Sequence, residues 1–589
     1  MSVLSIILRM ISPLWVIADA AEDDQLFVRL GSFLQKGWLG PFNERTLQKG
    51  PAYPAFLAVA HQTHLPYLFV IQVVHLAACG ATAFAVWRLV RSKWIAFGIY
   101  VVLALDPAYF GYSAGRLLRD NWYSSVCLLL FALAALALPR PGPGASRGRS
   151  RWLAVGGVGL TSGFVLASYW LGRAEHPWMF PAIAVLLAGG VVARRRRLRM
   201  NPEPTPERTY WREWTAAAAP VVVGTVLAVT VLGAAIFTVS WRNERAYGAF
   251  ITDDLSGGEF ARLYEVWQSV HAGPARRFVP ISKPQRLAVY EVSRAARELQ
   301  PSLEGSLQSW IIPGCQQLKV CDDIAAGWIP FALRGATAAA GHIETEAAAQ
   351  SYWGRVADQI TGACASGLLA CARPMPMMLP SPSRFSPREF ASSMWAGIRY
   401  LAGYHVADTE RPFSTGTGIN WTLFHDNVNG LPSALPRYRA DESSALPRVR
   451  NLKVLRWVYS VAMFVLVPAA LVGFVFALAL RPRGLRTLWI LGAAAGLAAL
   501  GRLLLLALID STSFLVSAQP NYELPGVSFL LIFTVVGVVL LMRAAPPRTR
   551  WLSTRRAQRQ ATSGTESTPR SDTPSPAAGT EAVGPPRSP

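Results

Sequence analysis

The sequence predicts an α-helical polytopic membrane protein with about ten transmembrane helices, a mainly helical extracytoplasmic domain and a disordered cytoplasmic tail. Three observations support this fold class. The 589 residues are 52% hydrophobic and only 16% charged, with a mean hydropathy of +0.28, whereas soluble domains carry about 25% charged residues. The formal net charge is +22. Because the chain is so apolar, this charge indicates basic loops between membrane spans. The 20 Trp and 26 Phe residues exclude a disordered chain.

Apolar runs of the length that crosses a bilayer, about 17–25 residues, recur along the chain. The expected spans are 3–19, 65–87, 94–112, 122–138, 153–171, 178–193, 216–239, 454–480, 486–508 and 526–543. The first run contains Arg9 and Pro13, and a signal peptide is the alternative interpretation for it.

Every second loop between these spans is basic. The Arg and Lys residues gather at 88–93, 140–151, 194–199, 481–486 and 543–556. The positive-inside rule places these loops in the cytoplasm, so both termini are expected there. The high Ala, Arg and Gly content suggests a bacterial source, and hence the bacterial inner membrane. We attribute this charge to topology and to contact with anionic lipids rather than to nucleic-acid binding.

The spans divide the chain into four parts. These are a transmembrane region at 1–239 with a first outer loop at 20–53, an extracytoplasmic domain at 240–453, C-terminal transmembrane helices at 454–543 and a tail at 544–589. Phe260, Leu263, Tyr264 and Trp267 recur at helical spacing in the outer domain. The tail is rich in Ser, Thr, Pro and Gly and cannot bury enough apolar surface to fold.

The six cysteines fall into two groups. Cys79 and Cys127 lie inside expected spans, where a thiol packs as a small hydrophobe. The others lie in the outer domain and are Cys315, Cys321, Cys364 and Cys371. An even number on the non-cytoplasmic side predicts two disulfides, with three pairings open. A four-cysteine zinc site is the alternative, although the spacings are looser than in usual zinc sites.

Acidic residues stand out at the outer membrane face. Glu22, Asp23 and Asp24 follow a hydrophobic helix directly, where carboxylates are costly and are functional candidates by default. The alternative is that these carboxylates form a solvated helix end, or that they interact favourably with the dipole at the N-terminus of the next helix. The pairs at 253–254 and 322–323 in the outer domain are more typical of solvated turns than of a metal site.

The first outer loop contains an ordered set of motifs. It reads Asp23-Asp24, Phe27, Gly37-Trp38, Pro41, Lys49-Gly50-Pro51 and Tyr53-Pro54. In residue type and spacing this loop resembles the first outer loop of the GT-C superfamily of membrane glycosyltransferases, in particular the family 39-like branch of protein O-mannosyltransferases and aminoarabinose transferases. That branch has an acidic pair, an aromatic residue, a G-x-W-x-x-P element and a K-P-P element in this order. The sequence departs from it in its Asp-Asp pair and its Lys-Gly-Pro element.

Other outer loops show further likenesses to the same superfamily. The residues concerned are Arg116, Arg119 and Asp120 in the second outer loop, Arg173 and Glu175 in the third, and Tyr522 in the last. Arg173 and Glu175 resemble part of an R-E-x-x-W element. Tyr522 resembles part of an R-Y-x-x-P element in which Asn521 replaces the Arg. No motif of the superfamily covers residues 240–453.

Several of these residues also have a simpler interpretation. Lys49 and Arg119 could be interface residues whose side chains snorkel to water. Arg173 and Glu175 could only pair with each other. Asp120 could be the N-cap of the following helix.

The GT-C resemblance implies an inverting transfer of a sugar from a polyprenyl-phosphate carrier to a glycan, lipid or protein acceptor at the outer face. It implies Asp23 as the general base, with Asp24 as its neighbour. The implied ligands of the leaving phosphate are Lys49, Arg116, Arg119 and Arg173, and Asp120, Glu175 and Tyr522 complete the substrate-binding set. No cofactor is expected, and a divalent metal is left open. The alternatives are a transporter or lipid flippase and a non-catalytic cell-envelope assembly protein.

Overall fold

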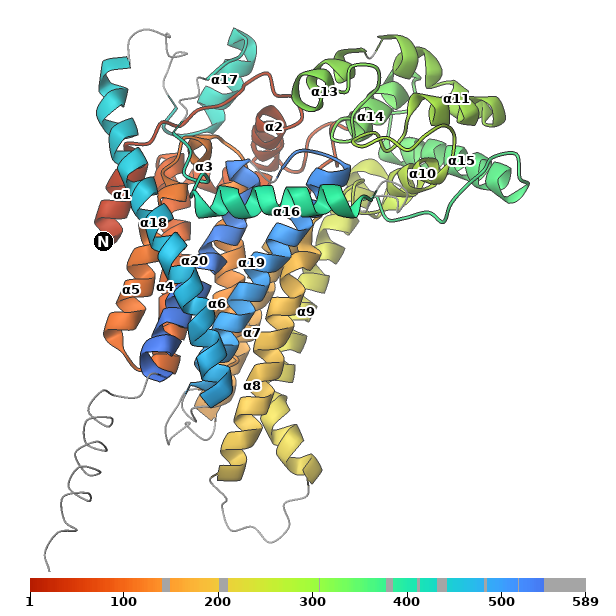
Figure 1. The fold of residues 1–589 in the computed structure, drawn as a ribbon. Coiled ribbons are helices and arrows are strands. Elements are labelled where there is room, and N and C mark those ends of the chain that lie inside the picture. Colours follow the sequence, from red (N-terminus) through yellow and green to blue (C-terminus); the bar gives the residue numbers. More distant parts are fainter. Residues whose placement is uncertain are drawn as a thin grey trace, which may run out of the picture.

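The computed structural model describes residues 1–139, 149–200, 210–306, 308–377, 385–409, 414–431, 442–480, 485–516 and 519–544. These residues form helices joined by loops, with isolated β-bridges and no strand among them. The predicted C-terminal tail lies outside them. Figure 1 shows a bundle of long helices with a smaller helical domain beside one end. We call this end the outer end, because the loops expected on the outer face lie there.

Within the described residues, seven helices are long and apolar enough to cross a membrane, so the chain is a membrane-embedded protein. They are α4 (Tyr67–Val90), α7 (Arg149–Trp170), α8 (Phe180–Met200), α9 (Tyr210–Tyr247), α18 (Glu442–Leu480), α19 (Arg486–Thr512) and α20 (Pro520–Ala544). The other three expected spans form shorter helices, α1 (Ser2–Met10), α5 (Lys93–Ala104) and α6 (Asp120–Ala135).

The first helix is shorter than the apolar run at 3–19 suggests. It ends at Met10, because Pro13 lacks a backbone N–H and disfavours helix in the residue before it. The chain then runs extended, with Trp15 bridged to Arg116 and Ile17 bridged to Thr415. This stretch lines the outer end of the bundle instead of crossing it.

Helix α20 is the most buried of the seven spans and packs against α18, α19 and α6. Small residues let α18 and α20 approach closely. A Cβ added at Gly473 would lie 2.1 Å from the carbonyl oxygen of Gly537, so only glycine fits there. Close contact through small residues is the usual way for helices to associate in lipid.

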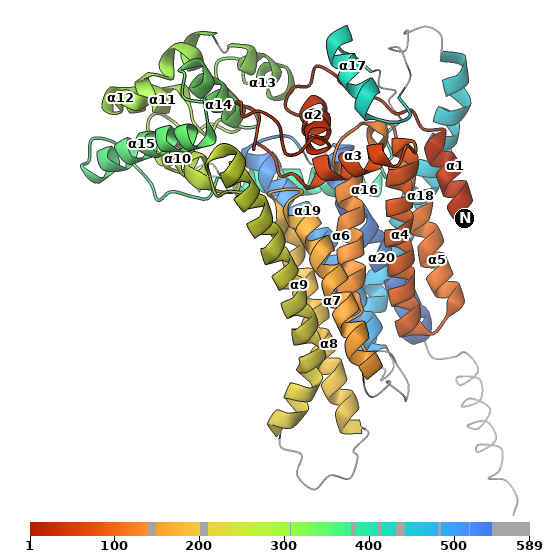
Figure 2. The ribbon, with the colours of Figure 1, turned by 180° about the vertical axis from the view of Figure 1, so that it is seen from behind.

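The outer domain has its own hydrophobic core. Its helices are α10 (Gly258–Ser269), α11 (Lys283–Val292), α12 (Arg294–Arg297), α13 (Ile311–Leu318), α14 (Ile329–Ala339) and α15 (Glu346–Ala365). Trp267 and Trp353 are fully buried at its centre. Figure 2 shows this domain beside the outer end of α9. Its helical character agrees with the spacing of apolar residues in the sequence.

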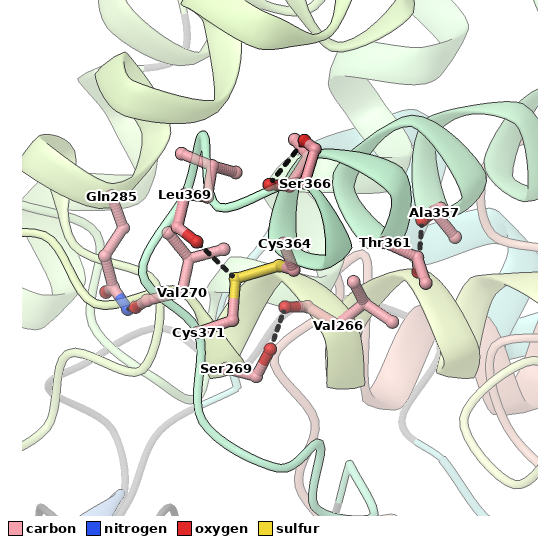
Figure 3. Close-up of a disulfide and its surroundings, with 11 residues drawn as sticks. Val266, Ser269, Val270, Gln285, Ala357, Thr361, Cys364, Ser366, Leu369 and Cys371 are labelled. Carbon is pink, nitrogen blue, oxygen red and sulfur yellow. Dashed lines mark hydrogen bonds between the residues drawn. A yellow bond between two sulfur atoms is a disulfide. The ribbon is translucent and has the colours of Figure 1, made fainter.

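Two disulfides close short loops in this domain, as the cysteine count predicts. They join Cys315 to Cys321 and Cys364 to Cys371, which selects the local pairing among the three that were open. In Figure 3 the second disulfide links the end of α15 to the segment that forms a β-bridge with Val270. Cys79 and Cys127 are free and buried.

Three of the four carboxylates in the acidic pairs of the outer domain are buried rather than in solvated turns. Asp254 is fully buried and forms an ion pair with Arg334. Asp323 is also buried and lies 2.8 Å from a guanidinium nitrogen of Arg286. Only Asp322 is exposed, where it pairs with Arg276 on the surface. Sequence alone could not show this, because the partners are distant in the chain.

Residues 385–409 and 414–431 pack on the bundle rather than in the outer domain. They contain α16 (Pro387–Ala402) and α17 (Gly418–Asn427). Tyr404, Trp421 and Phe424 belong to the hydrophobic core of the bundle. The expected domain at 240–453 therefore has two packing environments. The first outer loop forms α2 (Asp24–Leu34) and α3 (Ala52–Gln62), which lie above the spans.

Candidate functional site

The structure brings the site residues expected from the sequence into one region at the outer end of the bundle. They are Asp23, Asp24, Lys49, Arg116, Arg119, Asp120, Arg173, Glu175 and Tyr522. Their eight charged members lie together with Arg502 of α19. We call these nine charged residues the outer charge cluster. The cluster joins five segments that are far apart in the sequence.

Asp23 precedes α2 but does not cap it. Its carboxylate makes no hydrogen bond to the helix and accepts one from Lys49 Nζ at 2.6 Å instead. The Asp23 side chain is 53% exposed, whereas that of Lys49 is only 8% exposed. Although burial acts to raise the pKa of Asp23, Lys49, Arg116 and Arg119 lower it to about 2. Asp23 is therefore an ionised carboxylate that is open to solvent.

Asp24 has the opposite environment. Its side chain is fully buried and accepts hydrogen bonds from Arg116 Nε at 3.1 Å and Nη2 at 2.6 Å. The backbone N–H of Ile17 donates to its second oxygen. This two-pronged pairing fixes both side chains. Asp24 therefore supports the site, whereas Asp23 is the carboxylate that a substrate can reach.

Arg173 joins the second and third outer loops. It forms ion pairs with Asp120 and, at 2.6 Å, with Glu175. Its guanidinium also lies 5.2 Å from the ring centre of Tyr522. Asp120 is the first residue of α6, where Arg119 occupies the cap position. The pairing of Arg173 with Glu175 is thus real, but it is one part of a larger network.

Arg119 differs from the other cations of the cluster. It donates a hydrogen bond to the carbonyl of Gly172 at 3.0 Å and lies 5.6 Å from the ring centre of Phe27. Among the described residues no carboxylate forms an ion pair with it. Burial and the nearby charge of Arg173 lower the pKa of Arg119. Glu175 and Asp120 act in the opposite direction, and a bound anion would stabilise the Arg119 charge further.

Gly50, which stands after Lys49 where the similar loops have a proline, lies in a close backbone contact. A Cβ at this position would lie 2.0 Å from the carbonyl oxygen of Leu171. The loop that carries Lys49 therefore packs backbone to backbone against the third outer loop. Glycine at this point lets Lys49 and Arg173 belong to the same site.

Sequence reasoning missed three residues of this region. Arg502 lies within α19, is fully buried, and is 3.6 Å from Glu175. A charge inside an apolar run was the signal that could have found it. Phe331 of α14 lies 6.0 Å from Lys49 Nζ, and Arg334 lies one turn further along α14. No sequence signal links either of them to the first outer loop.

Arg334 attaches the outer domain to the loop that carries Lys49. It is fully buried, pairs with Asp254, and donates to the carbonyls of Glu44 at 2.7 Å and Thr46 at 2.8 Å. The N–H of Asp254 donates to the carbonyl of Leu47. Leu47 has a φ of 63°, an uncommon conformation that the surrounding bonds must hold. The outer domain thus shapes the loop of the site.

A cavity of about 440 Å³ opens where the first outer loop, the end of α9 and the outer domain meet. Its walls include the aromatic rings of Phe33, Trp38, Phe42 and Tyr247. Trp38 Nε1 donates to the side chain of Asn243, and Tyr247 Oη donates to the carbonyl of Gly40. These bonds hold the rings in place. The volume is in the range of small-molecule sites, about 300–1,000 Å³.

Among the described residues, no group of three or more His, Cys, Asp or Glu side chains is arranged to hold a metal ion. The carboxylates of the outer charge cluster are instead paired with Lys and Arg. The chemistry that this arrangement can support is therefore proton transfer at Asp23 and binding of an anion by the surrounding cations.

The substitution Glu175→Gln tests the ion pairs through pH. Burial acts to raise the pKa of Glu175, but Arg173, Arg502 and Arg119 lower it from 4.5 to about 2. A carboxylate whose pKa is lower in the folded protein than in the unfolded protein stabilises the fold. This stabilisation is complete above the pKa of the unfolded state and is lost as the pH falls toward the pKa of the folded state.

We therefore expect the Tm difference between wild type and Glu175→Gln, measured in detergent, to be constant above about pH 5 and to shrink between about pH 4.5 and 2. The same difference at every pH would contradict this assignment of the Glu175 charge.

Comparison with known proteins adds no relative to this picture. No protein-family model and no curated protein matches the sequence.

Proposed function

We propose that the protein is an inverting glycosyltransferase that moves a sugar from a polyprenyl-phosphate carrier to an acceptor at the outer face of the membrane. The observation that carries the proposal is the gathering of five cations in the outer charge cluster, one of which, Arg119, has no ion pair among the described residues. The cluster sets Lys49, Arg116, Arg119, Arg173 and Arg502 against Asp23, Asp24, Asp120 and Glu175. A lipid-linked phosphate supplies the missing negative charge and arrives from the bilayer side.

In the proposed reaction the acceptor hydroxyl oxygen attacks the anomeric carbon. The bond from that carbon to the phosphate oxygen breaks, and its electron pair leaves with the phosphate. Asp23 takes the hydroxyl proton. Its low pKa makes it a weak base while Lys49 is 2.6 Å away. A phosphate that draws Lys49 toward itself raises the basicity of Asp23 when the donor is bound.

Arg119→Met tests the phosphate site. Arg119 has a hydrogen bond only to Gly172 among the described residues, so the fold should tolerate the change. A charge-assisted hydrogen bond contributes about 1.5–3 kcal/mol, so we expect polyprenyl phosphate to bind about 10- to 100-fold more weakly. Native mass spectrometry of the purified full-length chain measures this affinity.

The control is Arg355→Met, which removes an exposed cation from the outer domain and should leave the affinity unchanged. Equal affinity of wild type and Arg119→Met would remove Arg119 from the phosphate site.

We also propose that the aromatic-lined cavity receives part of the acceptor, because it opens on the loop that carries Asp23 and Lys49. Ala246 is exposed and lines the cavity, so Ala246→Trp fills it without disturbing a buried contact. We expect KM for the acceptor to rise about tenfold with kcat retained.

Steady-state transfer assays with varied acceptor concentration measure this effect. Glu244→Trp is the matched control, since Glu244 is exposed on α9 and does not line the cavity. A rise in KM of the same size in both variants would exclude the cavity as the acceptor site.

A further inference from the structure

Helix α16 runs across the outer end of the bundle. Figure 1 shows it crossing the outer ends of the spans, including that of α19. Along one side it packs against α19, with Ser393 and Gly397 buried. These small residues allow close contact between the two helices.

Both ends of α16 are fixed at the same depth. At its C-terminal end, Ser460 of α18 donates to the carbonyl of Ala402 at 2.8 Å. At its N-terminal end, Glu389 pairs with Arg277 at 2.6 Å, and Arg277 donates to the carbonyl of Asp510 near the outer end of α19. The axis of α16 therefore runs along the outer end of the bundle.

The length of α18 agrees with a membrane boundary near Ser460. From Ser460 to the end of α18 at Leu480 the helix rises about 30 Å, at about 1.5 Å per residue. This equals the thickness of the hydrocarbon core, about 30 Å. Phe464, one turn below Ser460, is 78% exposed, as expected of a side chain that faces acyl chains. Thus α16 lies at the level of the lipid headgroups.

The side of α16 away from α19 carries an exposed stripe at helical spacing. Its members are Arg388, Ala391, Ser392, Trp395, Ile398 and Arg399. Trp395 is 59% exposed and Ile398 is 42% exposed. Large apolar side chains flanked by arginines are typical of a helix that rests in a membrane interface, and Trp favours that depth.

We propose that this stripe of α16 binds the phospholipid surface of the outer leaflet, with Trp395 and Ile398 inserted beneath the headgroups and Arg388 and Arg399 at the phosphates. The inference does not depend on the proposed enzymatic activity. Through the ion pair of Glu389 with Arg277, it gives the outer domain an attachment to the membrane surface.

The experiment places a fluorescent NBD label on α16 in the full-length chain reconstituted in phosphatidylcholine–phosphatidylglycerol vesicles. Trp395→Cys and Ser392→Cys supply two labelling sites, and Ser392→Cys removes no large side chain. The native cysteines do not compete, because Cys79 and Cys127 are buried and the other four form disulfides. Ile419→Cys on α17, where Ile419 is 88% exposed, is the control.

We expect both α16 labels to emit at shorter wavelength than the label at 419 and to be quenched at least about twofold more by nitroxide-labelled lipid. We expect iodide in the water phase to quench the label at 419 more strongly. Two results would overturn the proposal. In the first, iodide quenches the α16 labels as strongly as the control label. In the second, the α16 labels are shielded from both quenchers, as they would be in contact with a second protein copy.

Discussion

Replacing Asp23 by Asn should abolish most sugar transfer while leaving the protein folded. The amide has the shape of the carboxylate but cannot accept the proton of the acceptor hydroxyl. General bases contribute about 10²- to 10⁴-fold to a rate, so we expect kcat to fall by that factor with little change in KM for the donor. The Asn side-chain oxygen and the carbonyl of Glu22 can still accept hydrogen bonds from the buried Lys49 ammonium, so we expect the fold to be retained.

The matched control is Glu22→Gln. Glu22 is the neighbouring residue, and its carboxylate pairs with Arg45 at 3.0 Å rather than with Lys49. The two variants remove the same charge from adjacent positions. The rate of sugar transfer from a polyprenyl-phosphate donor in vesicles is measured for both variants. Equal rates for Asp23→Asn and Glu22→Gln would show that Asp23 is not the base.

Replacing Arg334 by Met should give the largest loss of stability in the outer domain. Arg334 and Asp254 are both fully buried, and removing one partner of a buried ion pair costs about 3–5 kcal/mol because the other charge stays uncompensated. The Met side chain also cannot donate to the carbonyls of Glu44 and Thr46. We therefore expect a lower Tm and faster amide exchange in residues 44–49.

Arg262→Met is the control for this prediction. Arg262 also pairs with two carboxylates, but its side chain is 41% exposed, and exposed pairs contribute about 0–1 kcal/mol. Hydrogen exchange and thermal unfolding in detergent compare the two variants. If Arg334→Met costs no more than Arg262→Met, the outer domain does not hold the Lys49 loop through Arg334.

The sequence predicted much of the membrane fold and of the outer charge cluster because both leave local signals. Apolar run length marks the long spans, and the motif order of the first outer loop selected Asp23 and Lys49. Contacts between distant segments left no such signal. Arg334 reaches the carbonyl of Glu44 across 290 residues, and Phe331 reaches Lys49 from a domain without a known motif.

Two errors have simple physical causes. Run length alone overestimated the first helix, because Pro13 ends it early. The pair at 253–254 resembles a solvated turn in sequence, whereas the fold brings Arg334 to Asp254. In both cases a backbone or tertiary constraint decides the outcome.

The most direct test of the proposed function is donor consumption by the wild-type protein. The purified full-length chain is reconstituted in vesicles with radiolabelled polyprenyl-phosphate sugars and an extract of cell-envelope acceptors on the outer side. We predict release of polyprenyl phosphate coupled one to one to labelled acceptor, with inverted configuration at the anomeric carbon. Movement of the intact donor across the bilayer without transfer would identify a flippase, and neither transfer nor movement with any donor would contradict the glycosyltransferase assignment.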